Sequence, residues 1–200
     1  MKNLIIAITC LMVFSTYCAK GQTETPQLLK EPASWQFERF KLPPAFSPDF
    51  PYKGVEELRF APGMFNKDSA DYFSYAFVAQ LDGTGSFTQS DLQNYLLKYF
   101  QGLCESTARQ RKLSIDTSKI AVLIKEKNKE KNITEYDATL NVFGVFVDGA
   151  PVVLNAEIKV MAGAGSNKTC ILFIASPKGK TDSIWQQLYK IQHDFTIPKN

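Results

Sequence analysis

Residues 52–81 read YKGVEELRFAPGMFNKDSADYFSYAFVAQL. This stretch predicts a short strand over residues 55–60, a Pro-Gly corner at residues 61–64 and a long aromatic strand over residues 71–81. Because successive side chains of a strand point to opposite faces, both faces of the aromatic strand are apolar. One face carries Phe73, Tyr75, Phe77, Ala79 and Leu81, and the other carries Tyr72, Ala76 and Val78. We therefore expect this strand at the centre of a sheet that is covered on both sides.

Apolar periodicity predicts the remaining elements. A first strand contains Trp35, Phe37 and Phe40. One helix begins at Ser90, its expected cap, and a second begins after Thr181 or Asp182. Their buried stripes consist of Leu92, Tyr95, Leu96, Tyr99, Phe100 and Leu103, and of Ile184, Trp185, Leu188, Ile191 and Phe195. Between the helices we expect a buried strand over residues 119–127, a charged hairpin tip, and strands over residues 135–142, 152–160 and 169–175.

The order of these elements is βββ-α-ββββ-α, which defines an α+β fold class. Links of hairpin length join the last four strands, so we expect a mainly antiparallel sheet of about seven strands, covered by two helices. This order resembles that of the PsbP/MOG1-type α+β sandwich, and a likeness of fold implies no function. A single domain is expected over residues 35–197, after a flexible lead-in at residues 22–34.

The first 21 residues have the pattern of a secretory signal peptide. Lys2 precedes an apolar run over residues 4–14 that is too short to span a bilayer, and Ala19 and Gly21 place small residues at a cleavage site. Cleavage after Gly21 predicts export to the periplasm, the outer surface or the extracellular medium. Two alternatives stay open: an uncleaved membrane anchor, and lipidation of Cys18.

The mature chain is expected to be nearly neutral. The signal peptide carries two lysines and no acidic residue, so its removal lowers the formal net charge from +3 to +1. Such a charge gives no electrostatic reason to expect nucleic-acid or anionic-lipid binding. We expect no cofactor, no transmembrane segment in the mature chain, and a ligand or protein partner of unknown identity.

Two cysteines, Cys104 and Cys170, remain after the predicted cleavage. In an oxidising compartment they could form one disulfide. The alternative is a pair of separate buried thiols. The spacing of the cysteines and of the lone His193 gives no metal site.

A proline-rich loop covers residues 43–51 and has Phe46 and Phe50 between its prolines. The favoured interpretation is a loop that its aromatic residues hold against the core. The alternative is an extended segment that docks on a partner.

Few residues are candidates for chemistry. Glu56 and Glu57 are adjacent on a strand and point to opposite faces, whereas Glu57 and Arg59 share a face. Each of these three residues is a weak candidate for catalysis if it faces a cavity. The sequence has no G-x-S-x-G motif and no glycine-rich phosphate loop after a strand.

The sequence DGTGSFTQSD at residues 82–91 resembles part of an EF-hand loop. The weak candidate ligands are Asp82, Thr84, Ser86 and Asp91. The first ligand position holds Gln80 instead of Asp, and a strand is predicted where a helix should precede the loop. We therefore expect a strand-to-helix connection and no metal.

The phrase LPPAF at residues 42–46, followed by EELRFAPGMF at residues 56–65, resembles a family of uncharacterised secreted bacterial proteins. The resemblance continues through the strand at residues 72–81 and the helix around Trp185. It implies export and a single domain, and no activity.

The favoured hypothesis is an exported, non-catalytic domain that binds a ligand or partner. Its apolar cleft would be lined by Phe73, Tyr75, Phe77 and Met64, unless these residues only fill the core. One alternative is a small hydrolytic enzyme that uses Glu56 or Glu57 with Arg59. The other is an interaction subunit that docks through the loop at residues 43–51.

Overall fold

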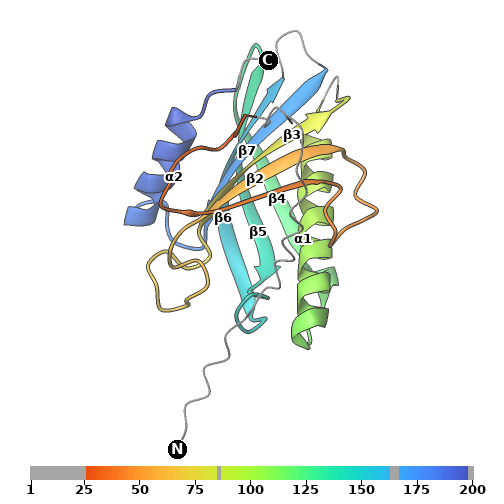
Figure 1. The fold of residues 1–200 in the computed structure, drawn as a ribbon, viewed down its shortest axis with the longest axis vertical. Helices are drawn as coiled ribbons and strands as arrows, with labels where there is room; N and C mark the ends of the chain where they lie inside the picture. Colours follow the sequence, from red (N-terminus) through yellow and green to blue (C-terminus); the bar gives the residue numbers. More distant parts are fainter. Residues whose placement is uncertain (1–25, 85–86, 163–166, 198–200) are drawn as a thin grey trace, which may run out of the picture.

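The computed structural model describes residues 26–84, 87–162 and 167–197. The predicted signal peptide and its cleavage site at Gly21 lie outside these residues. The fold is a seven-stranded antiparallel sheet with one helix on each side, which confirms the predicted α+β class and the order βββ-α-ββββ-α (Figure 1). The elements are β1 (Gln36–Leu42), β2 (Gly54–Phe60), β3 (Tyr75–Asp82), α1 (Gln89–Arg111), the 3-10 helix η1 (Thr117–Lys119), β4 (Ala121–Glu130), β5 (Ile133–Phe143), β6 (Pro151–Ala162), β7 (Lys168–Ser176) and α2 (Ser183–Asp194).

The sheet has the strand order β1-β2-β3-β7-β6-β5-β4. It consists of two meanders that meet where β3 pairs with β7 at the centre. Helix α1 connects them, because the chain leaves β3 at the centre and returns as β4 at the far edge. This arrangement places β1 and β4 at the two edges of the sheet.

The core between the sheet and α1 is rich in aromatic residues. Phe77 of β3 stacks on Phe173 of β7 with 4.6 Å between ring centroids, and both side chains are fully buried. The helix begins with a capping box in which Thr88 and Asp91 bond to each other's backbone N–H groups. The predicted cap, Ser90, lies inside the helix instead. Thr88 takes the position because its side chain can reach the third residue of the first turn.

A second core lies between the sheet and α2. Trp185 is fully buried there and packs with the predicted stripe of α2. Leu28, Leu29 and Trp35 belong to the same core, each with 8% exposure or less. Part of the segment predicted as a flexible lead-in is therefore packed on the sheet beside α2.

The aromatic strand is shorter than predicted. Residues 71–73 form turns before β3 begins at Tyr75, and Phe73 has a φ of 47°. In this left-handed conformation the chain cannot continue as a strand. The side chain of Phe73 nevertheless reaches the core, so apolar periodicity extended the predicted strand over a turn.

The strand predicted as buried, β4, is an edge strand with mostly exposed side chains. Leu123 is 66% exposed. Two glutamines of α1 cover backbone carbonyls of this edge: Gln89 donates to Ile124 and Gln93 donates to Val122. These contacts shield the edge from pairing with another chain.

The two cysteines do not form the possible disulfide. Both thiols are free and buried, and the sheet separates them because Cys104 lies in the α1 core and Cys170 in the α2 core. Burial raises the pKa of Cys104 to about 11 and that of Cys170 to about 12. Of the two alternatives, the structure has the pair of inert buried thiols.

Candidate functional site

Glu56 is sealed beneath α1. Its carboxylate has no exposed surface and accepts hydrogen bonds from the hydroxyls of Tyr99 at 2.7 Å and Tyr95 at 2.9 Å. Burial raises its pKa to about 7, although the two tyrosine hydrogen bonds act in the opposite direction. The group has the pKa of a general acid or base, but it has no exposed surface that a substrate could reach.

Glu57 faces the other side of the sheet and binds the segment before β1. One carboxylate oxygen accepts hydrogen bonds from the backbone N–H groups of Leu28 at 2.7 Å and Leu29 at 2.8 Å. The other oxygen forms an ion pair with Arg39 at 3.1 Å. Glu57 therefore anchors a backbone segment that would otherwise have buried, unpaired donors.

Arg59 anchors the same segment through its carbonyls. Its guanidinium donates to the backbone oxygens of Leu29, Lys30 and Trp35 at 2.9 to 3.2 Å. It also lies over the ring of Phe37 at 4.7 Å. As the sequence predicted, Arg59 shares a face with Glu57 and not with Glu56, so the three candidates form no common site.

The proposed aromatic cleft is filled. Met64, Phe73, Tyr75 and Phe77 are each 4% exposed or less. The hollow beside Met64 and Phe73 has a volume of about 0 Å³ for a water-sized molecule. These four residues pack as core in this structure.

Two of the four EF-hand-like residues are used in other contacts, whereas the buried hydroxyl of Thr84 has no hydrogen-bond partner among the described residues. Asp82 is 3.8 Å from Lys168, and Asp91 belongs to the capping box of α1. Strand β3 precedes the loop, as the sequence predicted, and Ser86 lies outside the described residues. In the described part of the chain, no three His, Cys, Asp or Glu side chains cluster as metal ligands would.

The proline-rich loop packs against α1 through its aromatic residues. Phe46 contacts Tyr99 at 5.1 Å and Phe50 contacts Tyr95 at 4.9 Å between ring centroids. Gly102 allows this approach, because a Cβ atom there would lie 2.7 Å from Ser47. The loop has the geometry of the favoured interpretation, a segment held against the core.

A groove that the sequence did not reveal opens on the α2 side of the sheet, next to β1. We call it the β1 groove, and its volume is about 1000 Å³. Its lining consists of Pro26, Gln27, Phe37, Arg39, Phe40, Lys41, Leu42, Lys53, Gly54, Val55, Gln80, Asp82 and Lys168. Gly54 is required at its floor, because its φ is 144° and a Cβ atom would lie 1.9 Å from the carbonyl oxygen of Gln80.

The β1 groove is cationic. It has four basic side chains, those of Arg39, Lys41, Lys53 and Lys168, and one acidic side chain, that of Asp82. Alternation of Phe37, Arg39 and Lys41 along β1 was the one sequence signal of this surface. Lys168 joins it only because β7 pairs with β3, which no local pattern discloses.

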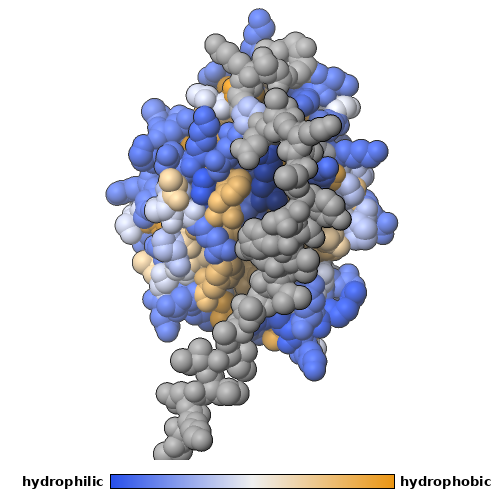
Figure 2. Space-filling model, viewed as in Figure 1, coloured by the Kyte–Doolittle hydropathy of each residue, from blue (hydrophilic) through white to orange (hydrophobic). Residues whose placement is uncertain are grey.

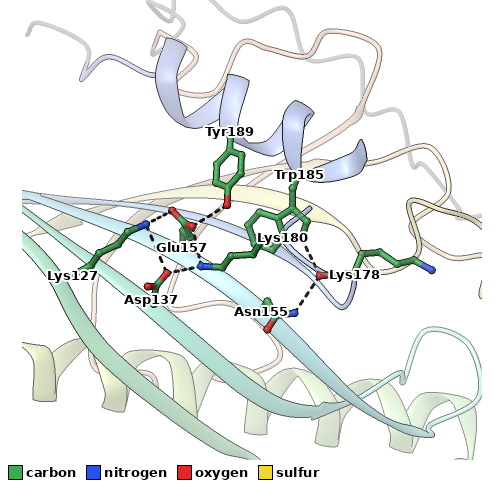
Figure 3. Close-up of polar contacts among 8 residues, drawn as sticks. All are labelled: Lys127, Asp137, Asn155, Glu157, Lys178, Lys180, Trp185 and Tyr189. Carbon is green, nitrogen blue, oxygen red and sulfur yellow. Dashed lines mark hydrogen bonds and ion pairs between the residues drawn. The ribbon is translucent and has the colours of Figure 1, made fainter. Parts of the chain in front are cut away.

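A charged cluster lies on the same side of the sheet, between the sheet and α2 (Figure 3). Glu157 of β6 contacts Lys180 at 2.9 Å, the hydroxyl of Tyr189 at 3.0 Å and Lys127 at 3.2 Å. Burial alone would raise the pKa of Glu157, but hydrogen bonds from Lys180 and Lys127 lower it overall. Lys180 also bonds to Asp137 at 2.5 Å. The cluster is internally paired and holds α2 on the sheet.

The visible face in Figure 2 is mostly hydrophilic and has an apolar strip near its middle. Among the described residues, the large apolar side chains that are at least 36% exposed are Phe37, Phe65, Leu123, Ile133, Val153 and Ile197. Of these, Phe37 lines the β1 groove.

Comparisons of the chain with protein-family models, with curated proteins and with solved structures gave no match. Neither α1 nor any other helix in residues 26–84, 87–162 and 167–197 combines the length and apolar character needed to cross a membrane.

Proposed function

We propose that this protein is an exported, non-catalytic domain that binds a ligand in the β1 groove. The observation that carries the proposal is the groove itself: a hollow of about 1000 Å³ has the size of a small-molecule site. It also combines apolar surface with a few polar groups, as ligand sites do. The aromatic residues that the sequence favoured as a cleft are packed as core, so the binding site moves to the opposite side of the sheet.

Catalysis by Glu56 or Glu57 with Arg59 has less support. Glu57 and Arg59 are occupied by backbone groups of residues 28–35. Glu56 has the pKa of an acid–base catalyst, and α1 would have to move before a substrate could reach it. A hydrolytic role would predict that Glu56→Gln abolishes turnover of an ester or glycoside substrate without loss of folding.

Docking through the loop at residues 43–51 also has less support. Its aromatic rings point into contacts with α1 and are not presented to a partner. If the loop does dock, substitution of its exposed residues should abolish partner capture and leave the fold intact.

Export rests on the N-terminal sequence alone, and so does the resemblance to secreted bacterial proteins. Mass spectrometry of the protein from the organism that encodes it would test the cleavage after Gly21. A mass that begins at Gln22 supports export through a cleaved signal peptide, and an intact Met1 contradicts it.

The same preparation tests the binding function. Native mass spectrometry should detect a bound molecule that is released on denaturation. Val55→Trp should fill the groove floor and remove that extra mass, whereas the matched control Val153→Trp, at an exposed site on β6, should retain it. A bare mass for the wild-type protein, or equal retention by both variants, would contradict binding in the groove.

A further inference from the structure

We infer that the ligand of the β1 groove is an anionic amphiphile, a carboxylate or phosphate on an apolar chain, whose anionic group binds Lys41, Lys53 and Lys168. This inference rests on the proposed binding function and adds the chemical class of the ligand. It follows from the distribution of charge, the placement of the lysines and the apolar surface next to them.

The groove is more basic than the rest of the chain. After the predicted cleavage the chain has 21 basic and 20 acidic residues, a difference of +1. The groove lining has four basic residues and one acidic residue, a difference of +3. The remaining 17 basic and 19 acidic residues have a difference of −2, so positive charge is concentrated at this surface.

The lysines lie at one end of four adjacent strands. Lys41 is next to the end of β1, Lys53 directly precedes β2, and Lys168 begins β7 opposite Asp82 of β3. Neighbouring strands are about 4.8 Å apart, so this row is about 14 Å long. A row of this length can surround one anionic head group from several sides.

Two of the three lysines have no anionic partner among the described residues. Lys168 is 3.8 Å from Asp82, and Arg39 is paired with Glu57. Within the described part of the chain, neither Lys41 nor Lys53 has an ion pair. Their charges face the groove uncompensated and would gain charge-assisted hydrogen bonds from a bound carboxylate or phosphate.

Apolar surface continues from the lysines along β1. Phe37 and Lys41 lie on the same face, since they pair with Arg59 and Val55 of β2. They are four residues apart, which is about 13 Å along a strand. Phe37 is 40% exposed, and Val55 of β2 lines the groove on the same face. Between the two ends, the charge of Arg39 is neutralised by Glu57, so an apolar chain can lie across its stem.

The test is a calorimetric titration of the chain from residue 22 onward with ligands of one chain length. The ligands are decanoate, decyl phosphate, the neutral decyl glucoside and the cationic decyl trimethylammonium. We expect the two anions to bind at least about tenfold more tightly than the other two, because only an anionic group can accept charge-assisted hydrogen bonds from the lysines. Lys41→Gln with Lys53→Gln should weaken the anions about tenfold. Lys125→Gln with Lys129→Gln, on the exposed edge strand β4, is the matched control and should leave binding unchanged.

Different failures have different meanings. Equal binding of the neutral and anionic ligands, abolished by Val55→Trp, would overturn the ligand class and leave groove binding standing. Absence of binding by all four ligands would overturn the ligand class, and native mass spectrometry would then decide the binding function. Binding to vesicles of anionic lipid without binding of decanoate or decyl phosphate would also overturn it, because the inference requires a single molecule in the groove.

Discussion

The two faces of the sheet differ in how completely they are covered. On the α1 side, a long helix and the proline-rich loop enclose an aromatic core that includes the buried Glu56. On the α2 side, a shorter helix and residues 28–35 cover only the middle of the sheet, and the β1 groove stays open. Glu56, the carboxyl group with the raised pKa, lies on the covered α1 side of the sheet. The accessible cationic surface, the β1 groove, lies on the open α2 side. A perturbed carboxylate therefore does not mark the binding site in this protein.

The largest effect is expected from truncating a buried side chain in the core between the sheet and α1. Phe77→Ala removes a fully buried ring that stacks on Phe173 and Tyr99 and should destabilise the fold by about 3–5 kcal/mol. Urea unfolding followed by circular dichroism measures this. Phe65→Ala, at a side chain that is 46% exposed, is the control and should cost much less. Equal costs would contradict the packing difference between the two positions.

The sealed carboxylate should make stability depend on pH. The pKa of the Glu56 carboxyl group is about 7 in the folded protein and 4.5 for an unburied glutamate. The folded protein therefore binds the carboxyl proton more tightly than the unfolded chain does. The resulting stabilisation, on the order of 3 kcal/mol, is complete below pH 4.5, decreases as the pH rises toward 7 and is absent above 7. Glu56→Gln should remove this slope in urea titrations between pH 4.5 and 7. An unchanged slope would show that Glu56 is ionised in the folded protein.

On the open face, Glu57→Gln should release the segment before β1. The variant loses the ion pair with Arg39 and weakens the acceptor for the N–H groups of Leu28 and Leu29, at a cost of about 1–3 kcal/mol. Limited proteolysis should then cut within residues 26–35 before the rest of the domain. The exposed pair Glu105–Arg109 gives a control, since Glu105→Gln should leave the cleavage pattern unchanged. Cleavage first at another site would contradict the anchoring role.

The smallest effect is expected from reductant. Cys104 and Cys170 lie on opposite sides of the sheet, so dithiothreitol should not change the melting temperature of the chain from residue 22 onward. A thiol reagent should label neither cysteine in the folded protein and both after unfolding, because burial raises their pKa values. A lower melting temperature in the presence of reductant would contradict this account and support a disulfide between Cys104 and Cys170.

Sequence periodicity predicted the fold well because each strand and helix carries its own apolar pattern. Helix α2 and strands β5, β6 and β7 have nearly the predicted limits. Errors arose where tertiary contacts decide: Phe73 reaches the core from a turn, and β4 is apolar at its start although it lies at an edge. The separation of Cys104 from Cys170 likewise depends on the position of the sheet, which spacing cannot reveal.

The candidate site was less predictable than the fold. Alternation along β2 correctly placed Glu56 opposite Glu57 and Arg59, but it could not show that backbone groups of residues 28–35 occupy Glu57 and Arg59. The β1 groove requires residues from β1, β2, β3 and β7 that meet only through strand pairing. Its positive charge is not evident from the overall composition, because the chain has nearly equal numbers of basic and acidic residues.

The most direct test of the open face as the binding face is a two-dimensional NMR titration of the chain from residue 22 onward with decanoate. Our account predicts shift changes in β1, at Lys53–Val55 and at Lys168, with Tyr95 and Tyr99 of α1 unaffected. Shift changes centred on α1 and the loop at residues 43–51, with β1 unchanged, would contradict it.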